Sequence, residues 1–152
     1  MPTSSGVDDY VPYPSRIVVN ANAIIAATLS DGIVRELLSA TEDEHYAPAF
    51  LREEIETYES MLLNRSELSG TELDTLLERL FRRVTFLSTK RTVQHHERAE
   101  REMRDIDPDD ALYVAAALEL DAAVWSTDDG LHERTVVPCL TNSAMVARVR
   151  GG

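Results

Sequence analysis

Carboxylate side chains gather at three places along the chain. The acidic groups are Glu53, Glu54 and Glu56, then Asp105, Asp107, Asp109 and Asp110, and finally Asp128 and Asp129. Carboxylates brought together from separate elements repel one another, and a divalent cation relieves that repulsion. Hard oxygen ligands favour Mg²⁺ or Mn²⁺, which polarise a phosphate oxygen and lower the pKa of a bound water. Because the chain has 27 Asp and Glu residues, most carboxylates are expected to be solvated surface, so only their placement points to a site.

The elements around these groups alternate between strands and helices. Strands are expected at residues 16–19, 45–47, 84–87, 122–125 and 136–137. Helices are expected at residues 21–29, 31–38, 48–63, 69–81, 92–103 and 109–120, with 143–149 ambiguous between helix and strand. Asp31, Ser69 and Asp109 are candidate N-caps, and Ser69 with Glu72 has capping-box spacing. This alternation predicts an α/β fold with a mostly parallel sheet of about five strands, whose site lies beyond the carboxyl ends of the strands.

Four blocks resemble the PIN-domain family of nucleases and occur in the family's order. They are Arg16-Ile-Val-Val-Asn-Ala-Asn-Ala-Ile-Ile25, Tyr46-Ala-Pro-Ala-Phe-Leu-Arg-Glu-Glu-Ile55, Asp105-Ile-Asp-Pro-Asp-Asp-Ala-Leu-Tyr-Val-Ala-Ala-Ala-Leu118 and Val124-Trp-Ser-Thr-Asp-Asp-Gly-Leu131. The resemblance implies a three-layer α/β/α fold and a metal-dependent endoribonuclease, often the toxin of a toxin–antitoxin pair. It also implies RNA as substrate, an antitoxin protein as partner and Mg²⁺ or Mn²⁺ as the only cofactor.

The resemblance places the family's acidic quartet on Asn20, Glu54, Asp110 and Asp128. Glu54 is preferred to Glu53 because it precedes an aliphatic residue, and Asp107 is the alternative to Asp110. The groups implied to hold these ligands in place are Asn22, Ser126 and Thr127.

Asn20 is the one departure from the family's pattern, which has aspartate at this position. An amide oxygen can ligate a hard cation but brings no negative charge, so metal binding is expected to be weaker. A catalytically impaired PIN-like module that binds RNA or a protein is therefore the alternative function. A receiver-like signalling domain is a third hypothesis, but Lys90 is misplaced for it.

The composition bounds the remaining hypotheses. The chain has 152 residues, predicted as a tail over 1–15 and one domain over 16–150, and a net charge of -12. Lys90 is the only lysine, and this acidic, lysine-poor composition is typical of salt-loving cytoplasm, where molar salt screens charge over about 3 Å. The single cysteine, Cys139, fits a reducing cytoplasm, and no apolar run is long enough for a membrane span.

Two further interpretations concern surfaces. Arginines line the helices expected at 69–81 and 92–103, either paired with glutamates, as in Glu78–Arg82 and Glu97–Arg101, or free to contact an RNA backbone. Apolar positions on the first of these helices, Leu76, Leu80 and Phe81, would form an exposed stripe and favour a homodimer. His95 and His96 are adjacent on a helix, so they are expected to diverge.

Overall fold

The computed structural model describes residues 16–29, 36, 44–102, 108–126 and 137–151. Its strands are β1 (Arg16–Val19), β2 (Glu44–Pro48), β3 (Thr85–Leu87), β4 (Ala123–Trp125) and β5 (Cys139–Leu140). Its helices are α2 (Ala21–Thr28), α4 (Phe50–Thr57), α5 (Glu59–Ser66), α6 (Gly70–Phe81), α7 (Thr89–Glu102), α8 (Pro108–Leu120) and α10 (Asn142–Gly151). The predicted tail and the predicted helix at 31–38 lie outside the described residues, except Glu36.

The five strands form one parallel sheet in the order β3-β2-β1-β4-β5. β1 is the central strand, with Val18 opposite Tyr46 of β2 and Val124 of β4. Ile17, Val18 and Val19 are fully buried because helices cover both faces of a parallel sheet, and such strands are continuous apolar runs. The expected parallel sheet is confirmed.

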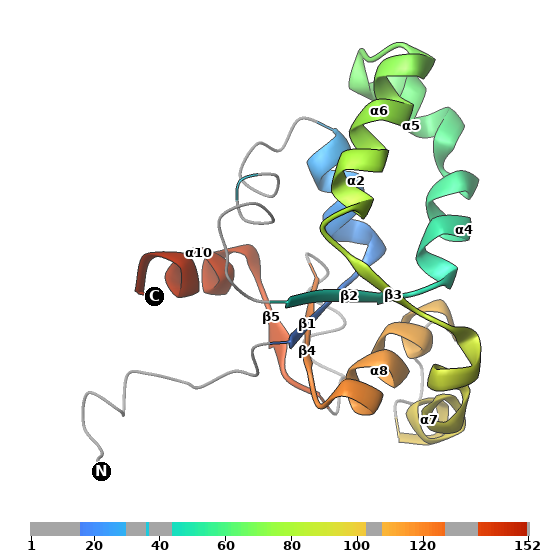
Figure 1. The fold of residues 1–152 in the computed structure, drawn as a ribbon, viewed down its shortest axis with the longest axis vertical. Helices are drawn as coiled ribbons and strands as arrows, with labels where there is room; N and C mark the ends of the chain where they lie inside the picture. The colour runs from blue at the N-terminus through green and yellow to red at the C-terminus, as the bar shows by residue number, and fades with distance from the viewer. Residues whose placement is uncertain (1–15, 30–35, 37–43, 103–107, 127–136, 152) are drawn as a thin grey trace.

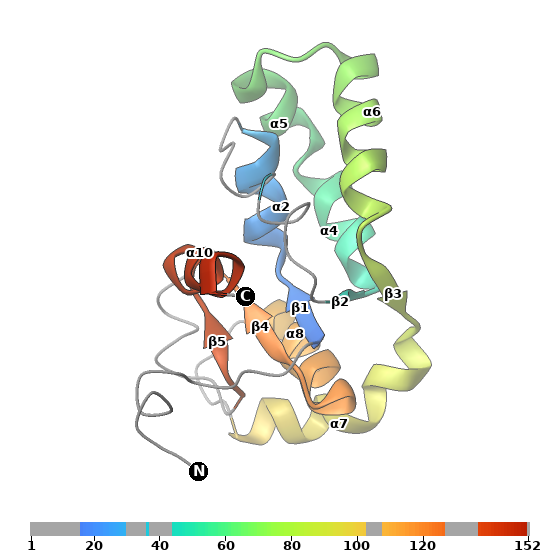
Figure 2. The same ribbon diagram turned by 60° about the vertical axis from the view of Figure 1, so that its left-hand side comes forward.

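Helices form a layer on each face of the sheet. Figure 1 shows α2, α4, α5 and α6 above the sheet and α7 and α8 below it, and Figure 2 shows α10 beside β5. The alanines of α8, Ala115 to Ala117, are fully buried, which lets this helix pack closely on β1, β2 and β4. The predicted three-layer α/β/α class is confirmed.

Two helix starts agree with the sequence. The side chain of Asn20 accepts a hydrogen bond from the backbone of Asn22 and caps α2. Ser69 caps α6 in a capping box, because its hydroxyl accepts from the Glu72 N–H while the Glu72 carboxylate accepts from the Ser69 N–H. Each cap satisfies backbone donors that have no partner within the helix.

Several predicted boundaries were wrong. The helix expected over 48–63 is two helices, α4 and α5, separated at Tyr58, whose backbone leaves helical geometry at φ -95° and ψ 6°. Pro48 ends β2 and does not open the helix, while Asp109 is the second residue of α8 and not its cap. The fifth strand is Cys139–Leu140 rather than 136–137, and the ambiguous segment at 143–149 belongs to helix α10.

The apolar stripe on α6 packs inward. Leu80 is buried, and Leu76 and Phe81 are half-buried against the core, so the stripe gives no support to the predicted homodimer. The homodimer stays a prediction. The exposed large apolar side chains of the described residues are Tyr58, Leu63 and Val93. Within the described part of the chain, no helix is both long and apolar enough to cross a membrane.

Candidate active site

The topology brings four of the predicted site positions to one edge of the sheet. Asn20 directly follows β1, Ser126 directly follows β4, and α4 with Glu54 follows β2. The last turn of helix α8 connects to the amino end of β4. The first turn of α8, which contains Asp110, therefore lies at the opposite edge of the sheet, where the strands have their carboxyl ends. The carboxyl ends of neighbouring parallel strands are where α/β folds build their sites.

Glu54 and α8 are joined by a hydrogen bond between side chains. The Tyr113 hydroxyl, from a side chain that is only 1% exposed, donates to Glu54 Oε1. Asp110 lies one helical turn before Tyr113, and residues three apart share a face of a helix. Glu54 and Asp110 are both half-buried, and Tyr113 links Glu54 to the helix that carries Asp110. Tyr113 was not among the predicted site residues, although its spacing of three from Asp110 was a usable signal.

Asn20 is held firmly at the centre of this edge. Its side chain is 2% exposed, and its Oδ1 accepts from the Asn22 N–H at 2.9 Å. Its backbone N–H donates to the Trp125 carbonyl at 3.1 Å, and its carbonyl accepts from the Ala23 N–H at 3.0 Å. Asn22 itself is half-buried, and its backbone N–H is the donor that the Asn20 side chain caps.

The end of β4 is fixed by contacts with the C-terminal segment. Ser126 is fully buried, and its backbone N–H donates to the Leu140 carbonyl at 3.2 Å. The Trp125 Nε1–H donates to Asn142 Oδ1 at 2.9 Å, which ties the strand to the first residue of α10. These contacts hold Trp125 and Ser126 in place at the sheet edge.

Three predicted site residues, Asp107, Thr127 and Asp128, lie outside the described residues. Among the residues that are described, no three His, Cys, Asp or Glu side chains come together as a metal site. By topology alone, Asn20, Glu54, Asp110 and Ser126 lie toward one edge of the sheet, and the predicted ligand set stays a prediction.

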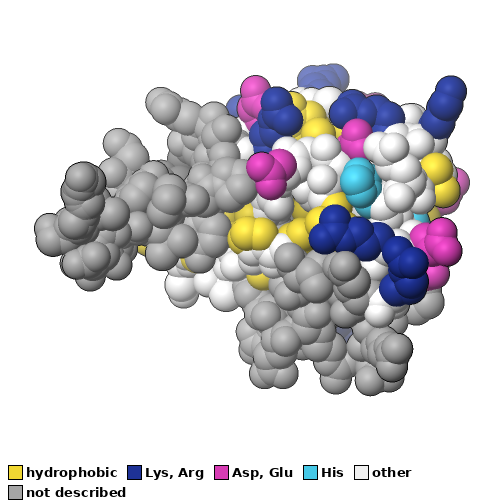
Figure 3. Space-filling model, turned by 90° about the horizontal axis from the view of Figure 1, so that it is seen from below, with side chains coloured by type: hydrophobic (Ala, Val, Ile, Leu, Met, Phe, Trp, Pro, Cys, Tyr) yellow, Lys and Arg dark blue, Asp and Glu magenta, His cyan; other side chains and the backbone are white. Residues whose placement is uncertain are grey.

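The histidine pair behaves as expected for neighbours on a helix. His95 Nε2 lies 3.3 Å from Glu119 of α8, while His96 Nε2 lies 3.4 Å from Glu100 of its own helix. In Figure 3, basic, acidic and histidine side chains intermingle on the face seen from below. The two rings thus contact different carboxylates, and neither reaches the sheet edge through these contacts.

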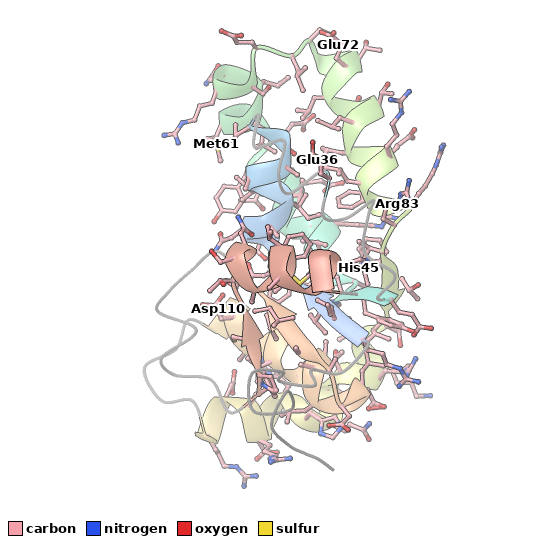
Figure 4. The ribbon with its side chains drawn as sticks, turned by 90° about the vertical axis from the view of Figure 1, so that its left-hand side faces the viewer. Glu36, His45, Met61, Glu72, Arg83 and Asp110 are labelled. Carbon is pink, nitrogen blue, oxygen red and sulfur yellow. The ribbon has the colours of Figure 1, made fainter. Side chains whose placement is uncertain are left out.

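The arginines do not form the predicted pairs. Neither Glu78–Arg82 nor Glu97–Arg101 is among the ion pairs of the described residues, whereas Arg91 lies 3.9 Å from Glu119. Arg52 of α4 lies over two aromatic rings, with its guanidinium carbon 4.9 Å from the centroid of Phe81 and 4.3 Å from that of Phe86. Figure 4 shows Arg83 and Asp110 on opposite sides of the view, so the basic end of α6 does not adjoin the acidic edge.

Comparisons with known proteins agree with this architecture. The sequence model of the PIN domain matches residues 18–141. The search of curated proteins finds no match. The structure of VapBC2 from Rickettsia felis, bound to a DNA fragment from its promoter, is similar with a TM-score of 0.66 at 11% identity, covering 83% of this chain and 98% of that one.

Two further solved structures are similar. FitAcB from Neisseria gonorrhoeae has a TM-score of 0.64 at 17% identity and covers 84% of this chain and 98% of its own. FitAB bound to an IR36 DNA fragment has a TM-score of 0.56 at 18% identity, with coverage of 83% and 94%. At these identities the similarity establishes a shared fold.

Proposed function

Because this chain belongs to the PIN domain family, we propose that it is a metal-dependent endoribonuclease that hydrolyses RNA phosphodiester bonds. The observation that supports this best is the hydrogen bond that Tyr113 donates to Glu54, because it joins α4 to the helix that carries Asp110. Two half-buried carboxylates from separate elements are costly to hold near each other without a cation. The edge therefore has the acidic character that a phosphodiesterase site needs.

The donor set suits Mg²⁺ or Mn²⁺, which take oxygen ligands. Glu54 and Asp110 would hold the ion together with Asp128, and Asp107 remains the alternative to Asp110. When bound, the ion polarises a phosphate oxygen and lowers the pKa of a water molecule. Asp107 and Asp128 enter this proposal from the family's pattern, since both lie outside the described residues.

The chain's own residues set the geometry of these ligands. The Tyr113 hydroxyl donates to one oxygen of Glu54 and so restrains the orientation of that carboxylate. Such outer hydrogen bonds orient metal ligands, and their loss commonly lowers affinity or activity by 10- to 100-fold. We assign the same supporting role to Ser126, Thr127 and Asn22.

An antitoxin protein is the proposed partner. The support is the fold shared with VapBC2 and with FitAB, both of which are described as bound to DNA. We propose that a small DNA-binding protein covers the acidic edge of this chain and holds it inactive. Co-expression of the product of the neighbouring gene, followed by co-purification, tests this partner separately from catalysis.

The nuclease proposal is tested by comparing RNA cleavage by the wild type with cleavage by variants that each carry one substitution. The purified protein is incubated with single-stranded RNA in the presence of Mn²⁺ or of EDTA. We expect cleavage with Mn²⁺ only, and a loss of at least 100-fold in Asp110→Asn because the charge of one ligand is removed. Asp74→Asn is the matched control, since Asp74 is exposed on α6. Cleavage that survives in Asp110→Asn would contradict the assignment of this site.

A catalytically impaired RNA-binding or protein-binding module is the second candidate, and one residue favours it. Asn20 occupies the position of the family's first aspartate and brings no charge to the acidic edge. In that case the wild type would bind RNA or its partner without cutting, and Asn20→Asp would cut. The cleavage assay therefore separates the two candidates.

A further inference from the structure

Four arginines group where α6 ends. Arg79 and Arg82 are exposed and three residues apart, so they share a face of the helix end, and exposed Arg83 follows them. Arg52 of α4 joins this group, because its guanidinium carbon lies 4.9 Å from the ring centroid of Phe81, the last residue of α6. We call these four arginines the arginine corner. Figure 4 shows Arg83 at the end of α6 that is nearer the sheet.

Nearby carboxylates do not neutralise the arginine corner. The ion pairs of the described residues include none of its four members. Glu56 follows Arg52 by four residues, and Glu78 precedes Arg82 by four, which is a spacing that allows ion pairs on a helix. Neither pair forms, although the chain has 27 acidic residues. The corner therefore keeps its positive charge available on the surface of an acidic protein.

The helix dipole explains only part of this arrangement. Cations are favoured at the C-terminus of a helix, which accounts for the arginines at the end of α6. Arg52 is the third residue of α4, where the dipole disfavours a cation. Two aromatic rings hold it there, since its guanidinium carbon also lies 4.3 Å from the ring centroid of Phe86. The result is an exposed guanidinium in a defined position, and its planar set of donors matches the oxygens of a phosphate.

We infer that the arginine corner binds the phosphate backbone of RNA, at a surface separate from the acidic edge. This inference rests on the proposed function, because RNA is the substrate proposed there. The net charge of -12 repels a polyanion, so an RNA strand needs a local basic surface to stay bound. Phe81 and Phe86 are half-buried and contact Arg52, so the corner offers guanidinium donors to phosphates and should bind RNA with little dependence on sequence.

The experiment measures the binding of fluorescein-labelled single-stranded RNA by anisotropy, over a series of KCl concentrations. EDTA is present throughout, so binding is measured without the proposed metal-dependent cleavage. The wild type is compared with Arg52→Gln and with the double variant Arg82→Gln/Arg83→Gln. Arg65→Gln/Arg101→Gln is the matched control, because it makes the same change of charge at exposed positions of α5 and α7.

We expect the double variant to bind RNA about tenfold more weakly, because two phosphate contacts are lost. The slope of log affinity against log salt should become shallower by about 1.4, at about 0.7 for each contact. Arg52→Gln keeps a flat amide over the rings and should make the slope shallower by about 0.7. The control should stay within about threefold of the wild type, since only the overall charge changes. In Mn²⁺ the double variant should raise KM for RNA cleavage and leave kcat unchanged.

Each alternative result has a definite meaning. Equal losses in the control and the double variant, or no RNA binding by the wild type, would overturn the inference. Labelled polyglutamate that binds more tightly than RNA, and loses that binding in the double variant, would overturn it in favour of an acidic protein partner. If cleavage depends on Asp110 but RNA binding does not depend on the corner, the nuclease proposal stands alone. If RNA binding depends on the corner and no cleavage occurs, the inference stands and the chain is a binding module.

Discussion

The hydrogen bond from Tyr113 to Glu54 joins α8 to α4, and Tyr113→Phe removes the hydroxyl that donates it. Phenylalanine fills the same buried space, so the change leaves no cavity. A hydrogen bond to a charged group contributes about 1.5–3 kcal/mol. Because Glu54 is half-buried and keeps contact with water, the lower end of that range applies. We expect the free energy of unfolding to fall by about 1.5 kcal/mol.

Urea denaturation followed by circular dichroism measures this loss. The midpoint should fall with the slope unchanged, and the melting temperature should fall by about 3–6 °C for a chain of this length. Tyr58→Phe is the matched control, because Tyr58 is 40% exposed and its hydroxyl should contribute almost nothing. Mn²⁺-dependent RNA cleavage should also fall in Tyr113→Phe, since Glu54 loses its fixed orientation. A variant within about 0.5 kcal/mol of wild type would refute the reasoning, because surface changes alone reach that size.

Three further predictions concern other parts of the molecule. Backbone and side-chain hydrogen bonds from Ser69 hold the pKa of Glu72 below its usual value of 4.5. The stability that this contact adds is therefore present above pH 4.5, and it is lost as the pH falls through the lowered pKa of the folded state. Ser69→Ala should cost about 1 kcal/mol at pH 7 and flatten the acid limb of a melting-temperature profile relative to wild type; an unchanged limb would contradict the capping-box argument. Arg52→Ala should cost about 1 kcal/mol in urea denaturation through the lost contacts with Phe81 and Phe86, whereas Arg65→Ala should cost almost nothing. Sedimentation in high salt should give twice the monomer mass of 17.0 kDa if the predicted homodimer forms, and a species of 17.0 kDa alone would exclude it.

Short stretches of the sequence determined the central elements and the class of the fold. The β-branched run Ile17 to Val19 predicted β1, and Ser69 with Glu72 predicted the start of α6, because strand propensity and capping depend on residues that are close in the chain. The alternation of such segments was sufficient for a parallel α/β sheet. Since helix and strand directions follow from that alternation, it also predicted that polar groups at the strand ends would approach one edge. The family resemblance then selected Asn20, Glu54, Asp110 and Ser126 among them.

Only the tertiary structure shows which side chains contact one another at this edge of the sheet. Tyr113 meets Glu54 across 59 positions of sequence, and no local pattern identifies such a partner. The break at Tyr58 and the place of β5 also depend on packing, since the helical periodicity continues past Tyr58 and the β5 strand has only two residues. The sequence shows that Asn20 lacks a charge, but not which of its amide atoms caps α2. That choice depends on the three-dimensional position of the Asn22 N–H, because one hydrogen bond fixes the rotation of the whole amide.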